Sequence, residues 1–100
     1  MFGLKESDIS DITQILNRYP GISRAYIFGS RAKGNYKSGS DVDIAVKGDD
    51  ISYDTILNIA AYLNEETLMP YHFDVLNYQT IQSSDLREHI DRTGIMFYQK

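Results

Sequence analysis

The amino-acid sequence predicts an α/β (α+β) fold, with a small mixed central sheet and flanking helices. Two observations lead to this prediction. Stretches whose apolar residues recur at helical spacing alternate along the chain with short apolar or alternating stretches typical of strands. Clusters of Gly, Pro and Ser separate these stretches, and the resulting order is αβ(α)βαβαβ, in which the bracketed helix is a short turn. Since no repeat or low-complexity tract interrupts this order, we expect one domain over residues 1–100.

The first helix and the first strand are predicted from their boundaries. Ser7 is a typical N-cap residue, and the isoleucines and leucine over 9–16 recur at helical spacing behind it. Pro20-Gly21 ends this helix. The segment 22–28 is apolar and aromatic with little helical period, so we expect a buried strand that ends at Gly29.

The next two elements surround a polar loop. The turn at Gly29 leaves backbone N–H groups free, and residues 30–33 are expected to open a short helix there. Residues 34–40, GNYKSGS, are loop by composition. Residues 41–46 alternate carboxylates with apolar side chains at first, which predicts a strand with a polar face.

The second half of the chain is predicted to hold two helices and two strands. Residues 52–65 form an amphipathic helix, because their apolar residues recur at helical spacing. Residues 71–76, YHFDVL, form a strand with Asp74 on one face. A helix over about 83–92 begins at a serine cap and stops at Gly94, and the closing IMFYQ forms the last strand.

Composition describes an ordinary globular domain. The chain is 42% hydrophobic and 24% charged, and it has no cysteine, which excludes disulfides and cysteine-bound zinc. No signal peptide and no apolar run of roughly 18–20 residues is present, so we expect a soluble, cytoplasmic protein without a membrane partner. The net charge of −4 argues against a general nucleic-acid binder.

The basic residues are nevertheless concentrated around one segment. This concentration is compatible with a polyphosphate site, and equally with solvated loop charge. The residues concerned are Arg24, Arg31, Lys33, Lys37 and Lys47.

The segment 29–46, GSRAKGNYKSGSDVDIAV, carries the clearest functional signal. Asp41 and Asp43 lie two residues apart, so a strand would place both carboxylates on one face. Two such carboxylates repel each other unless a cation lies between them. Gly29 allows a backbone to approach phosphate oxygens closely, and Ser30 can donate its hydroxyl and N–H to them. These residues predict magnesium holding a nucleoside triphosphate.

A third acid would complete a two-metal arrangement for nucleotidyl transfer. In such a site one ion activates the attacking hydroxyl and the other holds the triphosphate. Asp74, flanked by apolar residues on a separate strand, is the best placed candidate. His72 lies two residues before it and can share its face, where a supporting role is favoured because magnesium prefers oxygen ligands.

The whole pattern resembles the DNA polymerase β-like nucleotidyltransferase superfamily. The residues that carry this resemblance are Gly29-Ser30, Ala32, Gly34, Ser40-Asp41-x-Asp43 and Asp74. Within the superfamily, the length of about 100 residues resembles the minimal nucleotidyltransferases (MNT proteins) of prokaryotes. The resemblance covers the element order of the whole chain, and its specific part is the segment 28–46 together with Asp74.

The resemblance implies a role for each matching residue. It implies that Gly29 and Ser30 hold the β- and γ-phosphates of ATP, with Arg31, Lys33 and Ser40 nearby in the nucleotide site. It implies that Asp41 and Asp43 bind both of two Mg²⁺ ions, and that Asp74 binds the catalytic ion and helps to activate the acceptor hydroxyl.

The resemblance also implies a partner. MNT proteins resemble antitoxins encoded beside HEPN-domain ribonuclease toxins, and members with all three acids are expected to transfer AMP from ATP to a toxin tyrosine. Two alternatives remain: a non-catalytic antitoxin that binds nucleotide and neutralises by contact, and a nucleotidyltransferase acting on a small molecule. Because no second domain follows the last helix, we expect a partner to supply part of the acceptor site, and exposed tyrosines such as Tyr36 are candidate partner contacts.

Overall fold

The computed structural model describes residues 1–37 and 39–100 of the chain. Ser38, part of the predicted loop 34–40, lies outside the described residues. The elements follow one another in the predicted order, except that the predicted helix 52–65 is divided into α3 and the π-helical η1 and that the 3₁₀-helical η2 is added. The bounds are α1 Glu6–Leu16, β1 Ile22–Phe28, α2 Ser30–Lys33, β2 Val42–Gly48, α3 Tyr53–Ala61, η1 Tyr62–Glu66, β3 Phe73–Asn77, η2 Tyr78–Thr80, α4 Ser84–Thr93 and β4 Ile95–Gln99.

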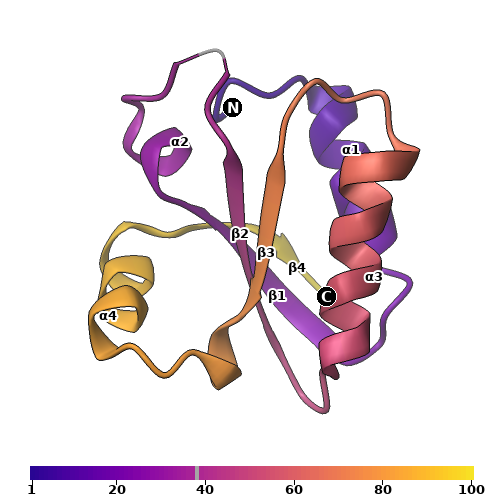
Figure 1. Ribbon diagram of the computed structural model, residues 1–100, viewed down its shortest axis with the longest axis vertical. Helices are drawn as coiled ribbons and strands as arrows, with labels where there is room; N and C mark the ends of the chain where they lie inside the picture. Colours follow the sequence, from indigo (N-terminus) through magenta and orange to yellow (C-terminus); the bar gives the residue numbers. More distant parts are fainter. Residues whose placement is uncertain (38) are drawn as a thin grey trace.

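The strands form a mixed sheet in the order β3-β2-β1-β4 (Figure 1). β1 is antiparallel to β2 and to β4, whereas β2 and β3 are parallel. A parallel pair needs a connection that returns the chain to the same end of the sheet, and the segment containing α3 and η1 makes this connection. The predicted small mixed sheet with flanking helices is therefore confirmed.

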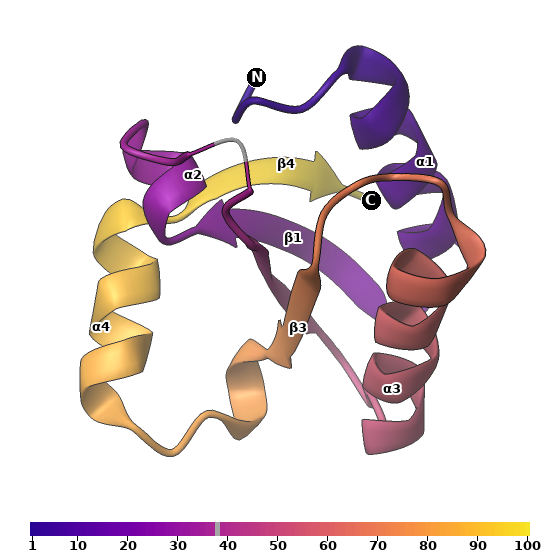
Figure 2. The same ribbon diagram turned by 45° about the horizontal axis from the view of Figure 1, so that its top comes forward.

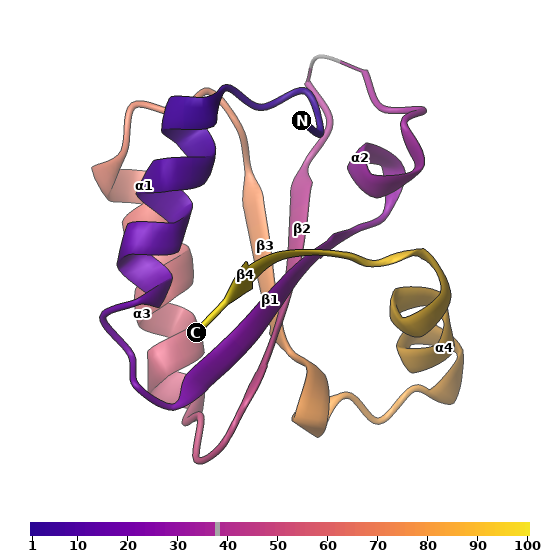
Figure 3. The same ribbon diagram turned by 180° about the vertical axis from the view of Figure 1, so that it is seen from behind.

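Helices cover both faces of the sheet. α1 and α3 lie side by side on one face, and α2 and α4 lie on the other side, as Figures 1 and 3 show from opposite directions. The larger cluster of buried side chains joins α1 and α3 to the sheet, and a smaller one joins α4 to the sheet. Within the part of the chain that the structure describes, no helix is long and apolar enough to cross a bilayer.

The alternation of side chains along β2 decides which face is chemically active. Val42, Ile44 and Val46 belong to the large core beneath α1 and α3. Asp43 therefore points to the opposite face, together with Ala45, which packs against Ile90 of α4. α4 covers this face around Ala45. Asp43, nearer the start of β2, is only partly buried. β2 begins at the same end of the sheet as α2 (Figure 2).

Two helix boundaries differ from the prediction. α1 begins at Glu6, with Lys5 and not Ser7 in the N-cap position. The reason is that the Asp8 carboxylate, in the first turn, accepts a hydrogen bond from the Lys5 amide at 3.0 Å. This bond makes Lys5 the N-cap residue of α1. The predicted helix 52–65 is α-helical only to Ala61 and continues as the π-helical η1. The cap and stop of α4 are confirmed at Ser83 and Gly94.

β1 and β4 have the predicted bounds, whereas the bounds of β2 and β3 differ from the prediction by one or two residues. β2 begins at Val42, so Asp41 lies immediately before the strand and not within it. β3 covers Phe73–Asn77 in place of the predicted 71–76. The predicted faces of this strand are confirmed, because Phe73 and Val75 are buried and Asp74 is exposed.

Candidate active site

Three chain segments bring the candidate acids to one end of the sheet. In the parallel pair, Asp43 of β2 is the register partner of Asp74 of β3. On its other side Asp43 is paired with Phe28, the last residue of β1, which leads directly into Gly29. Asp41 precedes β2 by one residue and is exposed. The predicted acids and the predicted turn are therefore neighbours in space.

The electrostatics of Asp43 are those of a crowded carboxylate. Burial raises the pKa of Asp43 above its usual value of 3.8, and the negative charges of Asp74 and Asp41 raise it further. A hydrogen bond between Asp43 and Asp74, which requires that one of the two acids keep its proton, acts in the same direction. A protonated His72 opposes these effects. The surroundings of Asp43 therefore disfavour its ionised form.

A divalent cation would relieve this crowding. The Asp43 and Asp74 carboxylates supply only oxygen ligands, and this donor set suits Mg²⁺. Among residues 1–37 and 39–100, no three His, Asp or Glu side chains are gathered closely enough to hold an ion together. The carboxylates of Asp43 and Asp74 fit the Mg²⁺ that the sequence predicts. Asp41 lies two residues before Asp43 in the chain.

Gly29 has a conformation and a location that exclude a side chain. Its φ of 76° and ψ of −152° lie in a region that only glycine adopts readily. A Cβ at this position would lie 2.5 Å from Asp43 Oδ2. The turn therefore brings bare backbone against the acid, and Ser30 begins α2 immediately afterwards.

Arg31 has different contacts from those expected at a phosphate site. Its side chain is 2% exposed. Nε and Nη2 donate to the Ser40 carbonyl oxygen at 3.1 and 2.8 Å, and Nη1 donates to the Phe2 carbonyl oxygen at 2.9 Å. The guanidinium also lies over the rings of Tyr36 and Tyr71, at 5.1 and 4.9 Å from their centroids. These contacts connect α2 to the residue that precedes Asp41, and phosphate binding by Arg31 stays a prediction.

The other predicted nucleotide residues lie around the same loop. Lys33 is exposed in the last position of α2, where its ammonium can reach solvent. The Ser40 hydroxyl accepts a hydrogen bond from the Lys37 amide at 2.8 Å, which closes the end of the loop before β2. Their contribution to nucleotide binding likewise stays a prediction.

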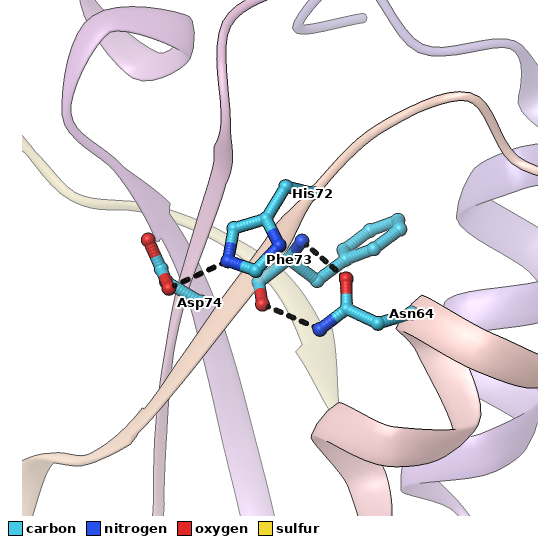
Figure 4. Close-up of polar contacts among 4 residues, drawn as sticks. All are labelled: Asn64, His72, Phe73 and Asp74. Atoms are coloured by element: carbon cyan, nitrogen blue, oxygen red, sulfur yellow. Dashed lines mark hydrogen bonds and ion pairs between the residues drawn. The ribbon is translucent and has the colours of Figure 1, made fainter.

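Figure 4 shows two polar residues near the start of β3, His72 beside Asp74 and Asn64 beside Phe73. His72 Nε2 lies 3.2 Å from Asp74 Oδ1, so the expectation that His72 shares the face of Asp74 is confirmed. Asn64, whose amide bonds to the Phe73 backbone, was not singled out by the sequence. A polar residue in a predicted amphipathic helix gives no signal that separates it from a solvated one.

Residues 10–100 match the family model described as polymerase beta, nucleotidyltransferase. No curated protein sequence matches the chain. Similar solved structures include a toxin-antitoxin with AMP-PNP, which has a TM-score of 0.76 at 22% identity and for which the alignment covers 97% of this chain and 75% of that chain.

Two further solved structures are similar to this chain. One is the tri-AMPylated Shewanella oneidensis HEPN toxin in complex with MNT antitoxin (TM-score 0.74, 18% identity, 97% and 74% of the two chains covered). Another is the toxin-antitoxin MntA-HepT (TM-score 0.73, 19% identity, 96% and 74% covered). These likenesses and the family match confirm the fold that the sequence predicts.

Proposed function

Because the chain belongs to the polymerase β nucleotidyltransferase family, we propose that it is a magnesium-dependent adenylyltransferase that transfers AMP from ATP to a tyrosine of a partner toxin. The observation that carries this proposal is the register pair Asp43–Asp74 beside the side-chain-free turn at Gly29. A cluster of repelling carboxylates next to bare backbone is suited to metal-bound phosphates and has no packing value of its own.

The proposed mechanism assigns the metal to the three acids. Asp41, Asp43 and Asp74 would hold two Mg²⁺ ions, which when bound supply charge neutralisation for the triphosphate and acidify the acceptor hydroxyl. The remaining work is done by the chain itself. Gly29 admits the β- and γ-phosphates close to its backbone, Ser30 donates hydrogen bonds to their oxygens, and Asp74 orients the acceptor hydroxyl and accepts its hydrogen bond.

The transfer step needs no reactant besides ATP and the acceptor tyrosine. The acceptor tyrosine oxygen forms a bond to the α-phosphorus of ATP, and the bond from that phosphorus to the α–β bridging oxygen breaks. Pyrophosphate leaves with the electron pair, and the tyrosine proton passes by way of the Asp74 carboxylate to solvent. The product is an AMP ester of the tyrosine.

The proposed partner is a HEPN-domain toxin. Support comes from the solved complexes that share this fold, one of which carries AMP-PNP and another an AMPylated HEPN toxin. Tyr36, 36% exposed within the loop that leads to Asp41, is a candidate contact for such a partner. One domain over residues 1–100, a cytoplasmic location and no general binding of nucleic acid or membrane stay predictions from the sequence.

One experiment separates the proposal from its alternatives. The pure protein is incubated with α-³²P-labelled ATP, Mg²⁺ and the protein encoded by its genomic neighbour, with an active homologous pair as positive control. We expect label on a partner tyrosine, loss of labelling with Asp43→Asn or Asp74→Asn, and loss of labelling with EDTA. An unlabelled partner beside a working control pair contradicts the proposal.

The two alternatives give different results in the same system. If Asp41→Asn with Asp43→Asn still neutralises the toxin in cells, the protein acts by contact and not by transfer. If label appears on a small hydroxyl compound in the absence of any partner, the protein is a small-molecule nucleotidyltransferase.

A further inference from the structure

The backbone next to Asp74 lies at the edge of the sheet. β3 pairs with β2 on one side only. The His72 carbonyl oxygen accepts a hydrogen bond from the Val42 amide at 2.8 Å, so the main-chain groups of His72 and Asp74 face β2. The N–H and C=O of Phe73 consequently face the open edge, while its ring is 1% exposed in the core. Polar backbone groups beside a buried ring require partners.

The side chain of Asn64 satisfies both groups. Asn64 Oδ1 accepts a hydrogen bond from the Phe73 amide at 2.7 Å, and Asn64 Nδ2 donates one to the Phe73 carbonyl oxygen at 2.9 Å (Figure 4). Such a reciprocal pair is what a residue of a neighbouring antiparallel strand would form. The amide of Asn64 therefore replaces a missing strand neighbour at one residue, the one that precedes Asp74.

Asn64 lies in the π-helical turn η1. Leu63, the preceding residue, is 0% exposed and anchors η1 in the core. Phe73, the residue to which Asn64 is hydrogen-bonded, is held by its own buried ring, which packs edge-on against Tyr71. Both ends of the hydrogen-bonded pair are thus held by buried side chains, and π-helical turns often occur at functional sites.

This clamp opposes a force that the acids themselves create. Asp43 and Asp74 occupy paired positions on adjacent strands, and when both carboxylates are ionised their like charges push the strands apart. β3 is a five-residue edge strand whose neighbour in the described sheet is β2. We propose that Asn64 is a positioning residue that holds the start of β3 against β2, and so keeps Asp74 in register with Asp43 before metal binds.

The test compares two chemically identical substitutions, Asn64→Leu and Asn58→Leu. Asn58 is exposed on α3 and its side chain makes no hydrogen bond to any described residue, so it is the matched control. Mn²⁺ affinity is measured by water-proton relaxation without any acceptor. For the transfer reaction, which rests on the proposed function, kcat and the KM for ATP are measured at a temperature where both variants are folded.

The positioning role predicts a specific pattern. We expect Asn64→Leu to bind Mn²⁺ about 10–100-fold more weakly than Asn58→Leu, as for other residues that orient metal ligands. Its kcat should fall by at least about tenfold, because small misplacements of reacting groups are costly. The KM for ATP should stay within about twofold of that of Asn58→Leu, since the turn at Gly29 and Ser30 is unchanged. Raised Mg²⁺ should restore part of the kcat.

A purely structural role gives a different pattern. If the two leucine variants share the same Mn²⁺ affinity and the same kcat, and differ only in unfolding midpoint, the inference is overturned. If the wild-type protein neither binds Mn²⁺ nor transfers AMP, the proposed function fails, which is a distinguishable result.

Asn64→Asp keeps the experiment decisive if Asn64→Leu does not fold. This variant can still accept from the Phe73 amide, but it places an anion against the Phe73 carbonyl oxygen in place of a donor. Positioning predicts weaker Mn²⁺ binding than in the wild-type protein. Added negative charge by itself would strengthen Mn²⁺ binding, so that result overturns the inference.

Discussion

Substituting Gly29 by alanine tests the geometry on which the site depends. The change adds one methyl group at a backbone conformation of φ 76° and ψ −152°. Holding a non-glycine residue in so sparsely populated a region costs about 1–3 kcal/mol. The new Cβ would also lie 2.5 Å from Asp43 Oδ2, which forces the carboxylate or the strand to move. Overpacking of this kind costs a further ~1–3 kcal/mol.

The two contributions together predict that Gly29→Ala lowers the free energy of unfolding by about 2–6 kcal/mol. This is a large part of the total for a typical domain, about 5–15 kcal/mol. Gly34→Ala is the matched control, because Gly34 also has a positive φ of 83° but nothing lies within 4 Å of its added Cβ. That variant should lose only ~1–2 kcal/mol, the cost of a left-handed backbone.

Urea unfolding at equilibrium measures both variants. The chain has eight tyrosines and no tryptophan, so tyrosine fluorescence and far-ultraviolet circular dichroism are suitable signals. Equal losses of stability in Gly29→Ala and Gly34→Ala would refute the close approach of Gly29 to Asp43. A double-mutant cycle with Asp43→Ala isolates the contact. The acid's removal should recover about 0.5–3 kcal/mol of the loss, and no recovery would mean that backbone strain alone is responsible.

Three further predictions concern Arg31 and the acids. Arg31→Met should lower the free energy of unfolding by about 2–4 kcal/mol in urea titrations, because it leaves two carbonyls without their donor, whereas exposed Lys33→Met should change it by less than ~0.5 kcal/mol. The raised pKa of Asp43 means that the metal-free folded protein holds a proton that the unfolded chain releases above about pH 4. The free energy of unfolding, measured by urea titration, should therefore fall as the pH rises from the pKa of Asp43 in the unfolded chain through its higher pKa in the folded protein. Asp74→Asn should make this fall smaller. At pH 7, Mg²⁺ should raise the melting temperature of the wild-type protein and leave that of Asp43→Asn nearly unchanged, whereas equal shifts would contradict the assigned site.

Local features of the sequence were sufficient to predict the elements and the faces of the strands. Apolar spacing predicts the helices, and the serine and glycine at the ends of α4 mark its limits. Alternation over 41–46 correctly separates the face of Asp43 from the face of Ile44. These features involve residues within one or two helical turns of each other, so the chain's own covalent geometry determines them.

Boundaries were less predictable, because capping depends on competition between nearby groups. Ser7 is a better N-cap residue than Lys5 in isolation, yet the Asp8 carboxylate pairs with the Lys5 amide and moves the start of α1. The π-helical turn η1 has no sequence signature that distinguishes it from the end of an α-helix.

The sequence by itself determined that this protein carries a Gly-Ser turn, two alternating acids and a third acid on a later strand, because each of these is a matter of spacing along the chain. Only the tertiary structure decided that β3 lies parallel to β2 with Asp74 opposite Asp43, that Arg31 turns inward to the Ser40 carbonyl, and that Asn64 holds Phe73. The physical reason is that strand pairing and buried hydrogen bonds join residues distant in sequence, and these contacts form only when the packed core brings their partners together.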